Sequence, residues 1–183
     1  MTTDPTPACR ILIYGVTGSG KSTAAKNVAA RTDLPLILAD ELTWEPGWVP
    51  VAEDRQRELF AEVVAEDRWV PDTAYGAWLD LVLPRAQLIV ALDDPRWFSL
   101  QRLLRRTLLR AIDKKPICNG NTQSWRGLYA QDSIVRWPFD SFIRKRDRMR
   151  AWANAPEGPP VLLVNRPQDL KACMCRFRSV SGR

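Results

Sequence analysis

GVTGSGKS, at residues 15–22, fits the pattern G-x-x-x-x-G-K-[ST] of a phosphate-binding loop. A short apolar run at residues 11–14 precedes it and predicts a strand, and the alanine-rich residues 21–31 predict a helix. Glycines let the backbone N–H groups wrap closely around phosphates, and the start of the following helix adds positive charge. The stretch therefore predicts a P-loop that binds ATP or a similar nucleoside triphosphate.

Two side chains of this loop are expected to take part in the chemistry. Lys21 would reach the β- and γ-phosphates, and the hydroxyl of Ser22 would coordinate Mg²⁺. The predicted nucleotide-binding residues of the loop are Gly15, Val16, Thr17, Gly18, Ser19, Gly20, Lys21, Ser22 and Thr23.

Further strands and helices alternate along the rest of the chain. Strands are predicted at residues 34–39, 68–72, 87–92 and 161–164. Helices are predicted at residues 52–67, 79–85, 96–112, 133–153 and from 167 onward. This alternation predicts an α/β fold with a parallel sheet, helices on both faces, and ligands at the carboxyl ends of the strands.

Aspartates end several of the predicted strands. Asp72 ends the third strand and is the predicted Mg²⁺ carboxylate, while Asp40 ends the second. At a shared sheet edge, one would hold the metal and the other would orient or deprotonate an acceptor hydroxyl. The alternative for each is a helix N-cap or a loop carboxylate. Asp93 and Asp94 are weaker candidates, since Asp94 precedes Pro95 and a long helix as a natural N-cap.

Charge is distributed unevenly along the chain, whose net charge is +6. Residues 1–95 hold 8 basic and 15 acidic residues, whereas residues 96–150 hold 14 basic and 4 acidic residues. A basic segment of this kind predicts phosphate binding, either of nucleotides or of nucleic acid. Its arginines at positions 102, 105, 106 and 110 recur at helical spacing, and Arg102 and Arg106 are predicted catalytic cations. The alternative is a solvated basic face or a nucleic-acid-binding stripe.

Two segments are expected to handle the acceptor and to cover the site. Residues 40–68 would form the acceptor-binding region, in which Trp44 and Trp48 either stack on a planar substrate or anchor the core. Residues 105–135 would form the lid, including a mobile loop at residues 114–129. Together with the P-loop, these segments predict one kinase-like domain over residues 1–183.

Composition excludes several classes of protein. The chain has no histidine, which removes Ser-His-Asp and Cys-His nucleophile systems, so carboxylates are left for acid–base work. The cysteines at positions 9, 118, 173 and 175 are expected to be free thiols and not a zinc site. Apolar runs are too short for a membrane helix, and the N-terminus lacks the pattern of a secretory signal. We expect a cytoplasmic protein that does not bind membranes.

Several short stretches along the chain occur together in one group of proteins. They are the P-loop, DELTWEPGW at residues 40–48, WVPD at 69–72 with Tyr75, LDDPR at 92–96, NGN at 119–121 with Trp125, and DSI at 132–134 with Trp137. With these stretches the chain resembles the bacterial adenylate-kinase-like P-loop proteins, often described as DNA topology modulation proteins. Many families share the P-loop, whereas the W-x-P-G-W stretch is more specific.

This resemblance implies a nucleoside-monophosphate-kinase-like fold with strand order 2-3-1-4-5 and an arginine-bearing lid after the fourth strand. It also implies that Asn165, Arg166 and Pro167 pack on adenine. The chain departs from its relatives at Thr73-Ala74, where they carry Gly-Asn, and at Thr122-Gln123, where they carry Arg-Glu. An acceptor contact and a lid cation of the group are therefore not carried over.

The leading functional hypothesis is an ATP-dependent phosphotransferase of the nucleoside/nucleotide-kinase type. It would transfer the γ-phosphoryl group to a small-molecule acceptor in a Mg²⁺-dependent, in-line reaction. The alternatives are a nucleotide-dependent regulatory or nucleic-acid-associated ATPase and a nucleotide-binding scaffold without turnover.

Overall fold

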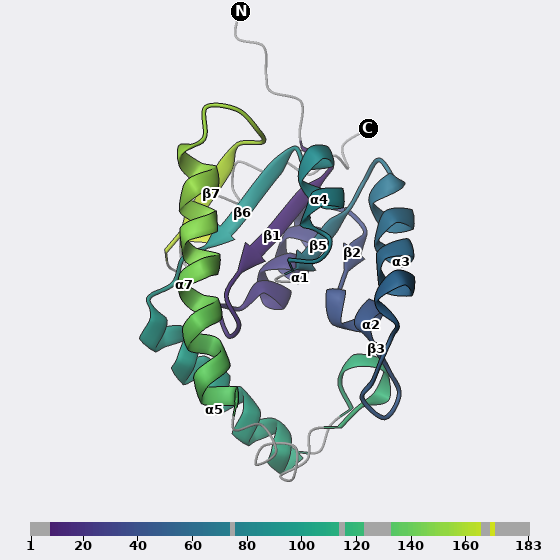
Figure 1. The fold of residues 1–183 in the computed structure, drawn as a ribbon, viewed down its shortest axis with the longest axis vertical. Coiled ribbons are helices and arrows are strands. Elements are labelled where there is room, and N and C mark those ends of the chain that lie inside the picture. The colour runs from purple at the N-terminus through teal and green to yellow at the C-terminus, as the bar shows by residue number, and fades with distance from the viewer. Residues whose placement is uncertain (1–7, 74–75, 114–115, 123–132, 166–168, 171–183) are drawn as a thin grey trace, which may run out of the picture.

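A computed structural model describes residues 8–73, 76–113, 116–122, 133–165 and 169–170. Its centre is a five-stranded parallel sheet built around β1 (Ile11–Gly15), as Figure 1 shows. The other strands are β2 (Leu36–Ile37), β5 (Val70–Thr73), β6 (Leu88–Leu92) and β7 (Val161–Val164). The order is β2-β5-β1-β6-β7, with every pair parallel. Counted along the chain, this is the predicted order 2-3-1-4-5, so the fold expectation is confirmed.

Alternation along β1 divides the core into two layers. Ile11 and Ile13 pack on one face of the sheet with Ala25 and Val28 of helix α1 (Lys21–Thr32). Leu12 and Tyr14 point to the opposite face, because successive strand residues alternate sides. That second layer takes its buried side chains from helices α3 (Glu53–Ala65), α4 (Leu79–Val82) and α7 (Ser133–Asn154). Helices therefore cover both faces of the sheet.

The second predicted strand is shorter in the structure than in the sequence pattern. β2 holds only two residues at the sheet edge, and helix α2 (Ala39–Thr43) begins two residues after it ends. The side chain of Asp72 supports this early turn, because its Oδ1 accepts a hydrogen bond from the Ala39 N–H at 2.9 Å. Asp40 consequently lies in the first turn of a short helix and not at the end of a strand.

The tryptophan-rich stretch forms a small antiparallel hairpin that the sequence pattern did not predict. Its strands are β3 (Trp44–Glu45) and β4 (Val49–Pro50), joined by a turn in which Gly47 and Trp48 both have positive φ. Helix α5 (Arg96–Asp113) and the one-turn 3₁₀ helices η1 (Leu83–Arg85) and η2 (Cys118–Gly120) complete the described elements. Of the described helices, none is long and apolar enough to cross a bilayer.

Candidate functional site

The P-loop lies between the end of β1 and the start of α1. Two of its glycines have positive φ, and one of them also lies very close to a neighbouring helix. Gly18 has φ 83°, and a Cβ there would stand 2.3 Å from the carbonyl oxygen of Ser99 in α5. Gly20, the residue before α1, has φ 89°. Side chains rarely adopt such φ values, so both positions favour glycine. The two glycines thus let the loop turn tightly into the N-terminus of α1, the part of a helix that favours anions.

Lys21, at the start of α1, is surrounded by charged groups from four other elements. Its Nζ donates to the Val16 carbonyl oxygen at 2.9 Å. Burial, together with nearby Lys145 and Arg106, lowers the pKa of Lys21 to about 8, against the opposing effects of Asp72 and Asp40. The pKa of this lysine is therefore set by burial and by a balance of two cations and two carboxylates around it.

Asp72 and Ser22 are brought together beneath the P-loop. Asp72 is buried at the end of β5, beside Ile13 of β1 in the parallel register. Burial raises the pKa of this carboxyl, while hydrogen bonds from Ser22 and the Ala39 N–H, and the charge of Lys21, act in the opposite direction. A hydroxyl paired with a carboxylate at a P-loop is a donor set that suits Mg²⁺, which takes few protein ligands and completes its shell with phosphates and water.

Asp40 lies close enough to Lys21, Asp72 and Arg106 to influence the pKa of each. It is open to solvent, whereas Asp72 is buried. The two carboxylates that the sequence predicted to share one sheet edge do lie together, although they differ in environment. This difference separates a buried carboxylate beside Ser22 from one that is accessible to solvent.

The two predicted catalytic arginines lie on the side of α5 that faces the P-loop and the acceptor region. Arg102 donates to the Ser19 carbonyl oxygen at 3.3 Å and forms an ion pair with Asp94. Partial desolvation and Arg110 lower the pKa of Arg106, while nearby Asp40 opposes that shift. Asp94 lies two residues before the first residue of α5 and pairs with Arg102, so it is not the N-cap that the sequence predicted.

Lys145 of α7 was missed by sequence reasoning. It is the largest charged influence on Lys21 after desolvation, and burial and two neighbouring arginines, Arg144 and Arg148, lower its own pKa. The basic composition of this helix was visible in the sequence. Which of its cations approaches the P-loop was not, because that depends on how α7 packs across the sheet.

The segment after α5 is hydrogen-bonded to the β3–β4 hairpin. Asn119 Nδ2 donates to the carbonyl oxygens of Trp44 at 2.6 Å and Glu41 at 2.8 Å. Asn121 donates to Glu45 at 2.9 Å and accepts from the Trp48 N–H at 2.9 Å. Residues 118–122 therefore join the predicted lid to the predicted acceptor region, next to Asp40.

The two tryptophans of the hairpin pack against each other. Their rings meet edge to face with centroids 5.7 Å apart, and Trp48 Nε1 donates to the Thr122 carbonyl oxygen at 2.9 Å. In this state they stabilise the hairpin and its contact with residues 118–122. Whether they also stack on a planar substrate stays a prediction.

Some predictions fall outside the described residues. These are the adenine contacts of Arg166 and Pro167, most of the lid loop, and the thiols at positions 173 and 175. Within the described residues, Cys9 and Cys118 form no disulfide, and no three His, Cys, Asp or Glu side chains gather as a metal-binding group.

No protein-family model matches the chain. Solved structures with a similar fold include a shikimate kinase from Acinetobacter baumannii, with TM-score 0.56, 15% identity, and coverage of 95% of this chain and 93% of that one. A gluconokinase from Sinorhizobium meliloti has TM-score 0.52, 17% identity, and coverage of 91% and 87%. A deoxyadenosine kinase from M. mycoides has TM-score 0.52, 12% identity, and coverage of 88% and 93%. These similarities establish the fold that the chain shares with these three proteins.

Proposed function

We propose that this chain is an ATP-dependent phosphotransferase of the nucleoside/nucleotide-kinase type, which transfers the γ-phosphoryl group to a small-molecule hydroxyl or phosphate acceptor. The observation that carries the proposal is the meeting of Lys21, the Ser22–Asp72 pair and Asp40 at one sheet edge. A P-loop alone indicates nucleotide binding. A second, accessible carboxylate beside it adds a group that can receive an acceptor proton.

In this proposal the P-loop backbone and Lys21 bind the β- and γ-phosphates. Ser22 and Asp72 would hold Mg²⁺, which when bound neutralises charge on the phosphates. Asp40 orients the acceptor hydroxyl and takes its proton. Arg102, Arg106 and Lys145 supply positive charge around the transferred group, which is where most of the catalytic effect of such enzymes arises.

The placement of the arginines supports a kinase over a nucleic-acid-binding ATPase. A nucleic-acid surface needs cations that face outward along a stripe. Instead, Arg102 is held by Asp94 and the Ser19 carbonyl oxygen, and Arg106 lies near Asp40. On α7, Arg146 and Arg150 are engaged by buried Asp93. These four arginines of the basic segment therefore interact with groups inside the protein and help to position the site.

The acceptor is identified by a transfer screen with γ-labelled ATP and Mg²⁺. The similar structures bear the names shikimate kinase, gluconokinase and deoxyadenosine kinase, so the panel covers nucleosides, nucleotides, sugar acids and cyclic hydroxy acids. We expect label to move to one chemical class with the wild-type protein and to none with Lys21→Ala. Release of labelled inorganic phosphate alone, with every member of the panel, would overturn the proposal in favour of an ATPase.

A further inference from the structure

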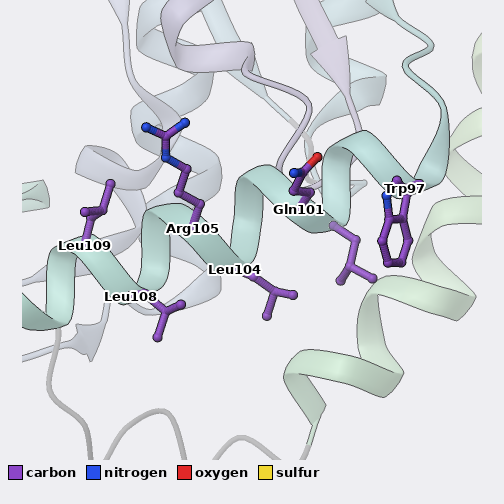
Figure 2. A pocket seen from close by; sticks show the side chains of 7 residues that line it. Trp97, Gln101, Leu104, Arg105, Leu108 and Leu109 are labelled. Atoms are coloured by element: carbon purple, nitrogen blue, oxygen red, sulfur yellow. The ribbon is translucent and has the colours of Figure 1, made fainter.

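Helix α5 has an apolar face that the rest of the described chain leaves uncovered. Trp97 is 71% exposed, Leu108 50% and Ile112 66%, although side chains of this kind are usually buried. Figure 2 shows the groove that runs along this face, with Leu104 and Leu108 projecting from one side of the helix. The residues that line it are Trp97, Leu100, Gln101, Leu104, Arg105, Leu108 and Leu109.

The side chains of this face form two parallel ridges. One consists of Leu100, Leu104, Leu108 and Ile112, and the other of Trp97, Gln101, Arg105 and Leu109, each with a spacing of four residues. A pair of helices whose four-residue ridges interlock crosses at about −50°, the commonest packing of helices in globular proteins. A second copy of this helix can therefore pack its own apolar ridge into the groove between these two ridges.

The exposed apolar residues of the face supply more than half of the area that a pair of chains requires. From their exposed fractions, the five apolar residues Trp97, Leu104, Leu108, Leu109 and Ile112 present roughly 500 Å² of accessible surface, against about 800 Å² per partner in a standard interface. Flanking Phe98, which is 52% exposed, widens the apolar surface further. The largest apolar patch on a single chain is about 300–600 Å² and is often functional, and this face has a size of that order.

The charges of the helix argue against a lipid surface as the occupant. A helix that lies on a membrane needs cations beside its apolar face that reach lipid headgroups. Here Arg102 is directed to Asp94 and the P-loop, and Arg106 lies near Asp40. Of the described arginines, only Arg105 lines the groove itself.

We infer that this face of α5 is the interface of a homodimer, in which the two α5 helices pack across a two-fold axis near Leu104 and Leu108. An isologous contact of this kind uses the same surface on both chains and closes without forming a chain of subunits. The opposite side of the same helix carries Arg102 to the P-loop, so the interface would also support the helix that holds this cation.

The test is sedimentation equilibrium of the full chain over a range of concentrations. We expect wild type to sediment as two chains and Leu108→Glu to weaken the dimer by at least about 30-fold, as for an interface hot spot. Val49→Glu is the matched control, because Val49 is 51% exposed on a different element, and it should leave the dimer intact. Circular dichroism establishes that each variant is folded.

A complementary-charge pair distinguishes a second copy from any other occupant. Leu104→Glu with Leu108→Glu, and Leu104→Lys with Leu108→Lys, should each sediment as one chain, whereas an equimolar mixture should form a heterodimer. A monomeric wild type would overturn the inference, as would a dimer that survives both double variants or a mixture that stays monomeric. Binding of wild type to anionic vesicles that both double variants lose, without a wild-type dimer, would assign the face to lipid instead.

Discussion

Asp93 Oδ1 accepts a hydrogen bond from Arg146 Nε at 2.7 Å, which ties the carboxyl end of β6 to the middle of α7. The other carboxylate oxygen of Asp93 accepts from Arg150 Nη2 at 3.2 Å, one turn further along the same helix. Asp93 is buried, and the two arginines offset the free-energy cost of removing its negative charge from water. Because Lys145 is adjacent to Arg146, the same contact sets how α7 presents Lys145 to the P-loop.

Asp93→Asn should therefore lower the free energy of unfolding by about 1.5–3 kcal/mol, the usual value of hydrogen bonds to a charged group. Urea unfolding followed by fluorescence measures this loss. Asp80→Asn is the control, because Asp80 pairs with Arg57 at the surface and should change stability too little to resolve. Equal stability of the two variants would show that the Asp93 contacts do not anchor α7.

Lys21→Ala should weaken binding of Mg²⁺–ATP and abolish turnover, since it removes the cation of the P-loop itself. Titration calorimetry measures the affinity, and release or transfer of labelled phosphate measures the turnover. Lys26→Ala, an exposed lysine in the same helix, should behave as wild type. Retained turnover in Lys21→Ala would place the nucleotide elsewhere.

Asp72→Asn should reduce Mg²⁺-dependent turnover by about 10²-fold or more while leaving nucleotide affinity without metal nearly unchanged. The P-loop backbone is intact in this variant, and an asparagine oxygen can still accept from the Ala39 N–H. Asp33→Asn, at an exposed position after α1, serves as the control. An unchanged dependence of the rate on Mg²⁺ concentration would transfer the metal role to Asp40.

Binding of ATP should take up a proton at mildly alkaline pH. Lys21 has a pKa of about 8 in the free protein, and the charge of a bound triphosphate favours its protonated form, which raises that pKa in the complex. Uptake is thus small at pH 7, about half a proton at pH 8, and larger above that, so affinity falls as pH rises beyond 8. Calorimetry in buffers of different ionisation enthalpy measures the uptake.

Lys21→Arg is the control for this experiment, because an arginine stays charged throughout the range and should show no uptake. Proton uptake that is the same in wild type and Lys21→Arg would mean that another group titrates.

Arg106→Ala should slow phosphoryl transfer by about 10²-fold or more, whereas Arg105→Ala should not slow it. The two residues are neighbours in sequence, but Arg106 lies near Asp40 and Arg105 lines the outer groove of α5. Single-turnover transfer of labelled phosphate measures both rates. Equal losses in the two variants would contradict the proposed orientation of the helix.

The same pair of variants tests the nucleic-acid alternative. If the basic segment were a nucleic-acid surface, both substitutions would weaken binding to duplex DNA, and that binding would fall steeply with salt. ATP hydrolysis would be spared. We expect only weak DNA binding at physiological ionic strength.

The sequence alone predicted the parallel sheet and the position of the P-loop. Local signals were sufficient for these two features: apolar runs mark the parallel strands, and G-x-x-x-x-G-K-S has one well-known context between a strand and a helix. The order of the strands, in contrast, was implied by the resemblance to a known family. Asp72 could be placed for the same reason, because the end of a buried strand in a parallel sheet lies at the ligand-binding edge.

Only the tertiary structure decided which charged side chains meet at that edge and which face away. Lys145 approaches Lys21 because Asp93 fixes α7 through Arg146 and Arg150, a contact between residues more than fifty positions apart. Asp94 forms an ion pair with Arg102 instead of capping α5. Arg105 and Arg106 are adjacent in sequence but lie on different sides of that helix. Helical periodicity predicts which residues share a face of a helix, but only packing against the sheet decides which face is turned inward.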